Sequence, residues 1–378
     1  MARTNGTGSD RTGLRSVTLS DQTPGRTAAG GRRRSKRRSD TARKALLILL
    51  SLLLLLGGGL VLAAFVISER LGDQVERIPN AFEGLDEERR PARPPTESAG
   101  ADALNILLTG VDTGANRQVT FDAGESVTGE RTDTIMILHI PGDRKSAILI
   151  SIPRDSWVEI PGHGISKINA AHSWGGPTLL IETVEQLTAL RIDHLAIIGF
   201  EGFRDLTDAL GGIQMTFPTP VEGASGQVFE AGEHTLHGEQ ALDYVRARYN
   251  LPEGDFDRVR RQQNLVRSLM RQTLSSGTVT NPIKLNKVLN AITQNLAVDD
   301  QFTTGKMRGL AIELRGIRSD VVTFMTAPVA GTGWEGDQAV VYLDLDKLNG
   351  LFDAVRVDDV DRYLSGNPEA DVLGETVR

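Results

Sequence analysis

The feature that most constrains this chain is an uninterrupted apolar run near its N-terminus. Ala45 to Ile67 are 23 residues, rich in leucine and free of charge. A helix that spans the hydrocarbon core of a bilayer needs about 20 such residues, so the run predicts a transmembrane helix. A cleaved signal peptide usually has a shorter apolar core and a small-residue cleavage site, for which Ala63-Ala64 is a poor candidate. We therefore expect a retained single-pass anchor over residues 45–67.

The charge on either side of this run predicts its orientation. Residues 1–44 contain twelve Lys or Arg and three Asp, whereas the rest of the chain has 30 Lys or Arg against 46 Asp or Glu. The basic segment is too polar to bury a core, so it is expected to be a disordered tail. Positive charge on this flank predicts a cytoplasmic N-terminus and an extracytoplasmic acidic domain at the cell membrane. The tail then serves topology and attraction to anionic lipid, and no nucleic-acid partner is expected. Without cysteine, thiol chemistry is excluded.

Beyond the membrane, the composition predicts three segments. Residues 68–102 are expected to be an extracytoplasmic linker, because charged sequence leads into the proline-rich stretch 90–95. Residues 103–360 are expected to form the folded domain, and residues 361–378 a mobile C-terminal tail.

Short apolar runs bounded by turn residues predict strands, and apolar residues at helical spacing predict helices between them. The predicted strands are 104–111, 134–140, 146–152, 194–200 and 213–217, with a strand pair at 321–327 and 339–343. The predicted helices are 177–190, 203–210, 238–245, 256–274, 282–296, 303–316 and 347–355. This alternation predicts an α/β or α+β fold, with a central mixed β-sheet flanked by helices in three layers.

Two aspartates stand beside the ends of predicted strands. Asp112 follows the first strand directly, and Asp133 stands at the start of the second. Ligands of α/β sheets gather at strand ends, and paired carboxylates suit Mg²⁺, with Mn²⁺ as a second candidate. The same spacing also fits aspartates that only stabilise turns.

Several cations also follow strands or begin helices. Arg154 follows a strand, where a surface salt bridge with Asp155 is the alternative role. Arg246 and Arg248 point the same way on an extended segment, and arginine pairs of this kind favour phosphate. Arg258 and Gln262 share a face near the N-terminal end of the predicted helix 256–274, where free amides favour anions. The other arginines of that helix, Arg261, Arg267 and Arg271, are expected on a solvated face.

In order and spacing, these motifs resemble the LytR-CpsA-Psr family over roughly residues 103–360. The matching stretches are Asn105–Asp112, Arg131–Thr134, Ser151–Asp155, Ile160–Gly164, Lys167–Ala171, Asp208–Gly212, Leu236–Leu242, Tyr244–Arg248, Asp255–Arg258 and Arg261–Gln263. One departure concerns the position two residues after the first aspartate. The family often has arginine there, whereas this chain has Gly114, with Arg117 as the nearest arginine.

The resemblance implies an extracytoplasmic, Mg²⁺-dependent phosphotransferase. Members of the family attach a polyprenyl-pyrophosphate-linked glycopolymer to peptidoglycan through a phosphodiester bond and release polyprenyl phosphate. Carried over residue by residue, Asp112 and Asp133 are metal ligands, and catalysis is assigned to them and to Arg154. The pyrophosphate-binding residues implied are Arg131, Arg154, Lys167, Arg246, Arg248, Arg258 and Gln262. The family's apolar lipid pocket lies behind this charged mouth.

Two other functions are compatible with the same residues. One is a pyrophosphatase that releases the glycan to water. The other is a non-catalytic, membrane-tethered regulatory protein that only binds the polyprenyl phosphate. The residues alone do not indicate which glycopolymer is moved, whether teichoic acid, capsule or an arabinogalactan type. The six histidines have no metal-ligand spacing, so a catalytic histidine is not expected.

Overall fold

The computed structural model describes residues 75–95, 100, 102–111, 132–247, 255–279, 281–314, 317 and 319–374. All of them belong to one compact unit, residues 63–378. The predicted basic tail and the predicted transmembrane helix at 45–67 lie outside the described residues. Within the described ranges, no helix has both the length and the hydrophobicity of a membrane span.

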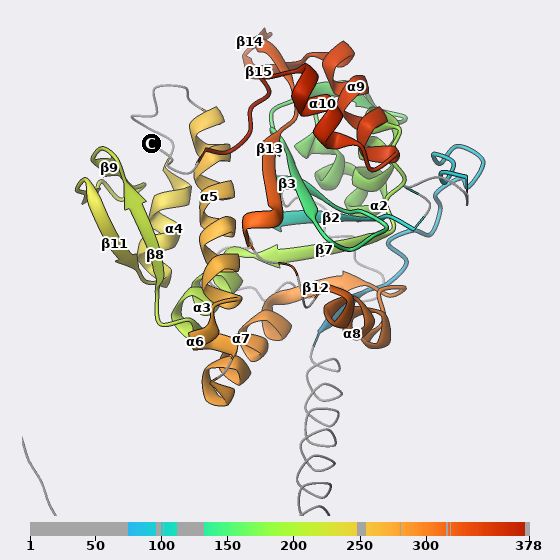
Figure 1. The fold of residues 1–378 in the computed structure, drawn as a ribbon. Coiled ribbons are helices and arrows are strands. Elements are labelled where there is room, and N and C mark those ends of the chain that lie inside the picture. The colour runs from blue at the N-terminus through green and yellow to red at the C-terminus, as the bar shows by residue number, and fades with distance from the viewer. Residues whose placement is uncertain are drawn as a thin grey trace, which may run out of the picture. The chain divides into compact units, whose positions relative to one another are not determined.

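Seven strands form a central mixed sheet, as the apolar runs predict (Figure 1). In spatial order they are β1 (Glu76–Ile78), β12 (Leu296–Asp299), β7 (His194–Gly199), β2 (Leu104–Val111), β3 (Thr132–Ile140), β4 (Ala147–Ile152) and β13 (Val322–Thr326). β2 pairs in parallel with β7, and β4 with β13, whereas β3 is antiparallel to both β2 and β4. The strands β2, β4, β7 and β13 therefore all run in one direction and end at one edge.

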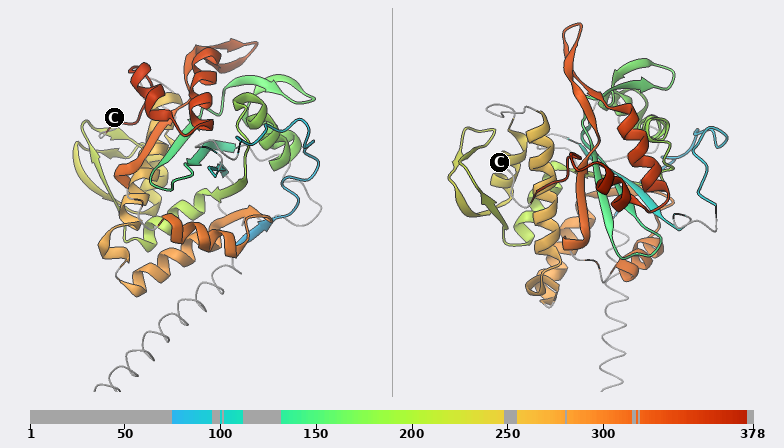
Figure 2. Two further views of the ribbon diagram at one scale, coloured as in Figure 1. Left: turned by 45° about the vertical axis from the view of Figure 1, so that its right-hand side comes forward. Right: turned by 45° about the horizontal axis from the view of Figure 1, so that its top comes forward.

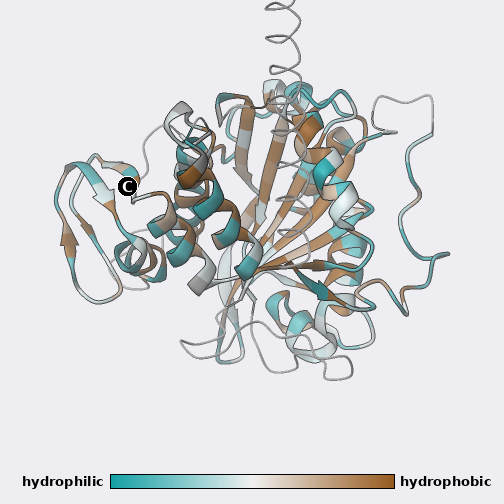
Figure 3. Cartoon of the chain, turned by 90° about the horizontal axis from the view of Figure 1, so that it is seen from below, coloured by the Kyte–Doolittle hydropathy of each residue, from teal (hydrophilic) through white to brown (hydrophobic). Residues whose placement is uncertain are grey.

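Helices cover both faces of this sheet, which confirms the predicted three layers (Figures 1 and 2). The helices are α2 (Asn169–Thr188), α3 (Phe200–Ala209), α4 (Gly238–Arg246), α5 (Asp255–Thr273), α6 (Ser276–Val279), α7 (Pro282–Asn295), α8 (Thr304–Glu313), α9 (Leu345–Arg356) and α10 (Val360–Gly366), with a 3₁₀ turn at Ser319–Val321. Successive residues of β3 face opposite layers, because side chains alternate along a strand. Ile137 packs in the core cluster that includes α2 and α9, whereas Met136 packs in the cluster that α5 contacts. Figure 3 shows the resulting apolar sheet with more polar helices around it.

A smaller layer lies beyond α5. It contains the hairpin of β8 (Ile213–Phe217) and β11 (Gly232–Leu236), and the short pair β9 (Val221–Glu222) and β10 (Val228–Phe229). These strands share a buried apolar cluster with α3, α4, α5 and α7. Helix α5 is consequently packed on two sides, against the sheet on one and against this layer on the other.

Two further hairpins extend from the carboxyl edge of the central sheet. One joins β5 (Trp157–Ile160) to β6 (Gly164–Lys167), and the other joins β14 (Val329–Glu335) to β15 (Gln338–Leu343). The view from above in Figure 2 shows the β14–β15 hairpin projecting away from the helices. Neither β5, β6 nor β14 is predicted from the sequence, since glycine and polar residues interrupt their apolar patterns.

The structure corrects the predicted boundaries of the domain. Residues 68–102 are not simply a linker, because β1 joins the sheet beside β12, and Arg90 forms an ion pair of 2.7 Å with the buried Glu185. Nor does the folded part end at residue 360. Helix α10 continues to Gly366, and Val372 then forms an antiparallel bridge with Met325 of β13.

One strand pairing is also corrected. The strands predicted at 321–327 and 339–343 both exist, but they do not pair with each other. β13 joins the central sheet beside β4, whereas β15 pairs with β14. Strand pairing depends on contacts between distant segments, which a local apolar pattern does not contain.

Candidate active site at the carboxyl ends of the central strands

The sheet topology brings to one edge the ends of the strands that adjoin the sequence-predicted aspartates and the first arginines in the chain. Asp112 follows β2 in the sequence, and Arg131 precedes β3, which starts where β2 ends. Arg154 follows β4, which ends at this same edge. Asp112 and Arg131 lie outside the described residues, as do the departure at Gly114 and Arg117.

The backbone around Asp133 is irregular. In the register of β2 against β3, Gly110 is opposite Thr134 and the next residue, Val111, is opposite Thr132. Asp133 is therefore the extra residue of a β-bulge. Bulges of this kind re-aim a side chain and are common beside active sites. The side chain of Asp133 lies outside the described part of the structure.

Arg154 and Lys167 meet at a shared carboxylate. The Lys167 ammonium lies 3.2 Å from one oxygen of Asp155, and the Arg154 Nε lies 3.6 Å from the other. All three side chains are half-buried. The backbone holds this arrangement, because the Asn169 amide donates to the carbonyl of Arg154 (3.2 Å). The pair of Arg154 and Asp155 is thus present, as the alternative role predicts, but it includes Lys167 and is partly withdrawn from solvent.

Two more predicted residues lie on the first turns of α5. Arg258 and Gln262 are one helical turn apart, and they are only 7% and 8% exposed. A guanidinium at this depth is costly to desolvate unless charged or polar groups surround it. Arg246 is the last residue of α4 and is half-buried, whereas Arg248 lies outside the described residues.

Gln263 connects α5 to the sheet and was not assigned a role from the sequence. Its side chain is fully buried, and its amide nitrogen donates to the Ser151 hydroxyl and to the Met325 carbonyl, both at 2.9 Å. Further along α5, Met270 packs against the cluster that contains Leu149, in the middle of β4. The first turn of α5, with Arg258, therefore extends beyond the strand ends on the side where Arg154 follows β4.

Arg261 is not on a solvated face, and that prediction is wrong. It is 4% exposed and donates to the carbonyls of Glu222 (3.0 Å) and Tyr244 (3.4 Å), with its guanidinium over the Tyr244 ring. Burial lowers the pKa of Arg261, while the nearby Tyr244 and Asp257 partly oppose that shift. Burial likewise raises the pKa of Tyr244. Arg261 is buried because the β9–β10 layer covers this side of α5, and its role is to join that layer to the helix.

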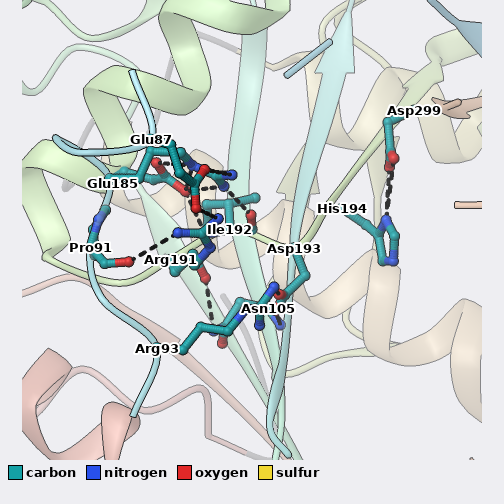
Figure 4. A network of polar contacts seen from close by, with 11 residues as sticks. Glu87, Pro91, Arg93, Asn105, Glu185, Arg191, Ile192, Asp193, His194 and Asp299 are labelled. Carbon is teal, nitrogen blue, oxygen red and sulfur yellow. Dashed lines mark hydrogen bonds and ion pairs between the residues drawn. The ribbon is translucent and has the colours of Figure 1, made fainter. Parts of the chain in front are cut away.

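The buried polar contacts at the opposite edge of the sheet are separate from this site. Near the amino ends of β2 and β7, the Ile192 amide donates to Glu185, and the Arg191 carbonyl accepts a hydrogen bond from the Asn105 side chain (Figure 4). His194 is bonded to Asp299, and the distance is 3.1 Å. His139 similarly lies between Asn105 (2.7 Å) and Asp358 (3.0 Å). Both histidines are thus engaged in structural contacts. Among the described residues, no group of three or more His, Asp or Glu is arranged to hold a metal ion.

Comparisons with known proteins agree on one family. The LytR_cpsA_psr family model matches residues 80–352. The cell wall biosynthesis protein LcpA of Corynebacterium glutamicum is 34% identical over 292 residues, which cover 68% of this chain and 56% of LcpA. Enterococcus faecalis TagU, named a polyisoprenyl-teichoic acid–peptidoglycan teichoic acid transferase, is 32% identical over 251 residues, covering 65% of this chain and 76% of TagU.

A solved structure has the same fold. The structure of TagT bound to LI-WTA superposes with a TM-score of 0.53 at 25% identity, covering 72% of this chain and 95% of the TagT chain. The matched part of this chain covers only 56% of the length of LcpA and 64% of the length of LcpB, the two curated relatives from Corynebacterium glutamicum.

Proposed function

This chain belongs to the LytR-CpsA-Psr family, and we propose that it is a phosphotransferase that attaches a glycopolymer to peptidoglycan. The proposed donor is a glycan linked through pyrophosphate to polyprenol, and the proposed product is a phosphodiester on the peptidoglycan. The names of the relatives support this assignment, since they describe cell wall biosynthesis and transfer of teichoic acid to peptidoglycan.

The observation that carries the proposal is the placement of cations at one edge of the sheet. Arg154 follows the end of β4, Lys167 ends β6 and pairs with Asp155 beside it, and Arg258 lies on the first turn of α5, which extends past the same strand ends. A pyrophosphate carries several negative charges, and partly buried arginines bind such groups strongly through paired N–H donors. Half-burial strengthens each of these interactions, because the local dielectric is lower than in water.

The proposed reaction is a displacement at phosphorus. The hydroxyl oxygen of an acceptor sugar attacks the phosphorus that bears the glycan and forms the new ester bond. The bond from this phosphorus to the bridging oxygen breaks, and that oxygen leaves on polyprenyl phosphate. The hydroxyl proton passes to a carboxylate, for which we propose Asp112. Arg154, Arg246 and Arg258 stabilise the charge that develops on the phosphate oxygens, by donors that are already in position.

We also propose that Asp112 and Asp133 hold Mg²⁺. Carboxylate oxygens are the ligands that this ion prefers, and the proposal is supported by the pairing of β2, which Asp112 follows in the sequence, with β3, in which Asp133 is the second residue. Mg²⁺ would neutralise the phosphate oxygens when bound. The register of β3 is interrupted at Asp133, and such irregularities are common beside active sites.

The apolar residues behind this edge suit a polyprenyl chain. Leu108, Leu138 and Val322 are only partly buried on the face of the sheet that α5 and α8 cover. A long isoprenoid donor is delivered from a bilayer, so we propose that residues 45–67 anchor the chain as a single-pass helix. The N-terminus would be cytoplasmic and the catalytic domain extracytoplasmic.

The test is a transfer assay with the full chain in detergent micelles. It would contain Mg²⁺, a labelled polyprenyl-pyrophosphoryl glycan and peptidoglycan fragments, with EDTA in a parallel series. Arg154→Ala is expected to lower the rate on the order of 10²–10³-fold if this arginine meets developing charge. Arg271→Ala, at an exposed position in the last turn of α5, is the matched control and should transfer normally.

The products distinguish the three possible functions. Label bound to peptidoglycan indicates the transferase, and label released to water indicates the pyrophosphatase. Donor that stays bound and unchanged indicates the regulatory protein. A normal transfer rate in Arg154→Ala would remove Arg154 from the mechanism.

A further inference from the structure

A groove of about 440 Å³ lies one strand away from the candidate active site, at the free edge of the central sheet. Its walls include Phe256 and Arg260 from the start of α5, Thr332 from β14, and Tyr363 from α10. Asn367, Glu369, Ala370 and Asp371 of the C-terminal segment complete it. This last segment is fixed in place, because the Thr326 amide donates to the Asp371 carbonyl at 2.9 Å.

The charges of this groove are balanced within it. Arg260 forms an ion pair with Asp371 at 3.2 Å, and Lys347 forms one with Glu369 at 2.9 Å. Pairing with Glu369 raises the pKa of Lys347, and pairing with Lys347 lowers the pKa of Glu369. The groove therefore presents polar donors and acceptors with no net charge, whereas the candidate active site beside it is lined by the cations Arg154, Lys167 and Arg258. It suits a ligand that is hydroxylated and uncharged, and it does not suit a polyanion.

The β14–β15 hairpin extends the groove outward. Thr332 lines the groove, and Trp334 lies on the same face of β14, two residues further along, because side chains alternate along a strand. Trp334 is 72% exposed near the tip of the hairpin. An indole offers a flat apolar face and one N–H donor, which matches a pyranose ring with hydroxyls at its rim.

The same hairpin is joined directly to the candidate active site. The Val341 amide of β15 donates to the carbonyl of Asp155 at 2.9 Å, and Asp155 is the carboxylate that Arg154 and Lys167 share. A chain lying along β14 would thus run from an exposed tryptophan to the strand ends where transfer is proposed.

We propose that the groove beside β13, together with Trp334, binds the uncharged sugar rings of the acceptor glycan. The inference rests on the proposed function for the identity of that acceptor. Donor and acceptor then approach the reaction centre from two directions, the anionic donor at the arginines and the neutral glycan along the β14 face.

The first experiment measures binding without any donor. The full chain in detergent micelles is titrated against a fluorescent N-acetylglucosamine tetramer, and polarisation is recorded. Trp334→Ala is expected to weaken binding roughly two- to tenfold, the range for loss of one aromatic stacking contact. Trp174→Ala is the control, since Trp174 is also exposed (45%) but does not line the groove.

Three results would overturn the inference. They are an undetectable affinity of the wild type, an unchanged affinity in Trp334→Ala, and displacement of the tetramer by an anionic poly(glycerol phosphate) at equal concentration. Thermal unfolding of each variant checks that the exposed substitutions leave the fold intact.

The second experiment is the transfer assay at varied acceptor concentration. Trp334→Ala should raise the KM for peptidoglycan fragments by a similar factor and leave kcat within about twofold, because the residue contacts only the acceptor. A wild-type chain that binds the tetramer but transfers no label would refute the proposed function and leave the groove as a glycan-binding site. A changed kcat with an unchanged KM would argue against acceptor binding there.

Discussion

Gln263 offers the sharpest test of how the site is assembled. Its buried amide nitrogen is the shared donor for the Ser151 hydroxyl and the Met325 carbonyl, each at 2.9 Å. Replacement by glutamate keeps the volume of the side chain but removes these two donated hydrogen bonds and a longer one to the Thr326 hydroxyl (3.4 Å), and it buries a carboxyl group. Each lost bond to a buried partner costs about 1–3 kcal/mol, so Gln263→Glu is expected to lower the free energy of unfolding by about 2–5 kcal/mol at pH 7.

The measurement is urea unfolding of the full chain in micelles, followed by circular dichroism. The control, Gln338→Glu, changes an exposed glutamine of β15 in the same way and should alter stability by less than about 0.5 kcal/mol. The transfer rate of Gln263→Glu, measured where the protein remains folded, should fall as well, because the first turn of α5 is no longer fixed to the strand ends. A loss of stability no larger than that of the control would refute the view that Gln263 connects α5 to β4 and β13.

Two further predictions concern the buried charged and polar groups away from the site. Arg90→Ala leaves the almost fully buried Glu185 without its ion-pair partner, so the free energy of unfolding should fall by about 3–5 kcal/mol at pH 7. The control is Arg89→Ala, which removes an exposed ion pair and should change the free energy of unfolding by less than about 1 kcal/mol. The second prediction concerns Tyr244, whose pKa is raised in the folded state. The neutral phenol therefore contributes fully to the free energy of unfolding at pH values below its ordinary pKa of about 10, and this contribution is lost as the pH rises through the higher pKa of the folded state. Urea unfolding at pH 8 and pH 11 should therefore show a smaller alkaline loss in Tyr244→Phe, and equal losses in the two proteins would contradict this.

The central strands could be predicted because their signal is local. β2, β3, β4 and β7 are continuous apolar runs bounded by turn residues, and strands buried on both faces have this composition. β1 has no such signal, since two of its three residues are charged. It becomes a strand only because β12 supplies hydrogen-bond partners, and β12 is more than 200 residues away in the chain.

On α5 too, some features could be predicted from the local sequence and others depend on distant segments. The spacing of Arg258 and Gln262 predicts one shared face, and the structure puts both side chains in a buried position. The burial of Arg261 and the contacts of Gln263 had no local signal, because they depend on β9 and on the ends of β4 and β13. Because α5 is packed against the central sheet on one side and the smaller layer on the other, charged residues of its first turns are buried. The sequence of the helix alone does not contain this information.

By itself, the sequence determined the family, the three-layer fold class and the order of the charged motifs, because these depend on residue type and spacing along the chain. The tertiary structure decided which strand ends share an edge, that Asp133 is the extra residue of a bulge, and that Arg154 and Lys167 meet at one carboxylate. It also brought residues from α5, β14, α9 and the C-terminal segment together into one groove with balanced charge. Those facts follow from long-range pairing and packing, whose free energy comes from contacts between segments that no local pattern relates.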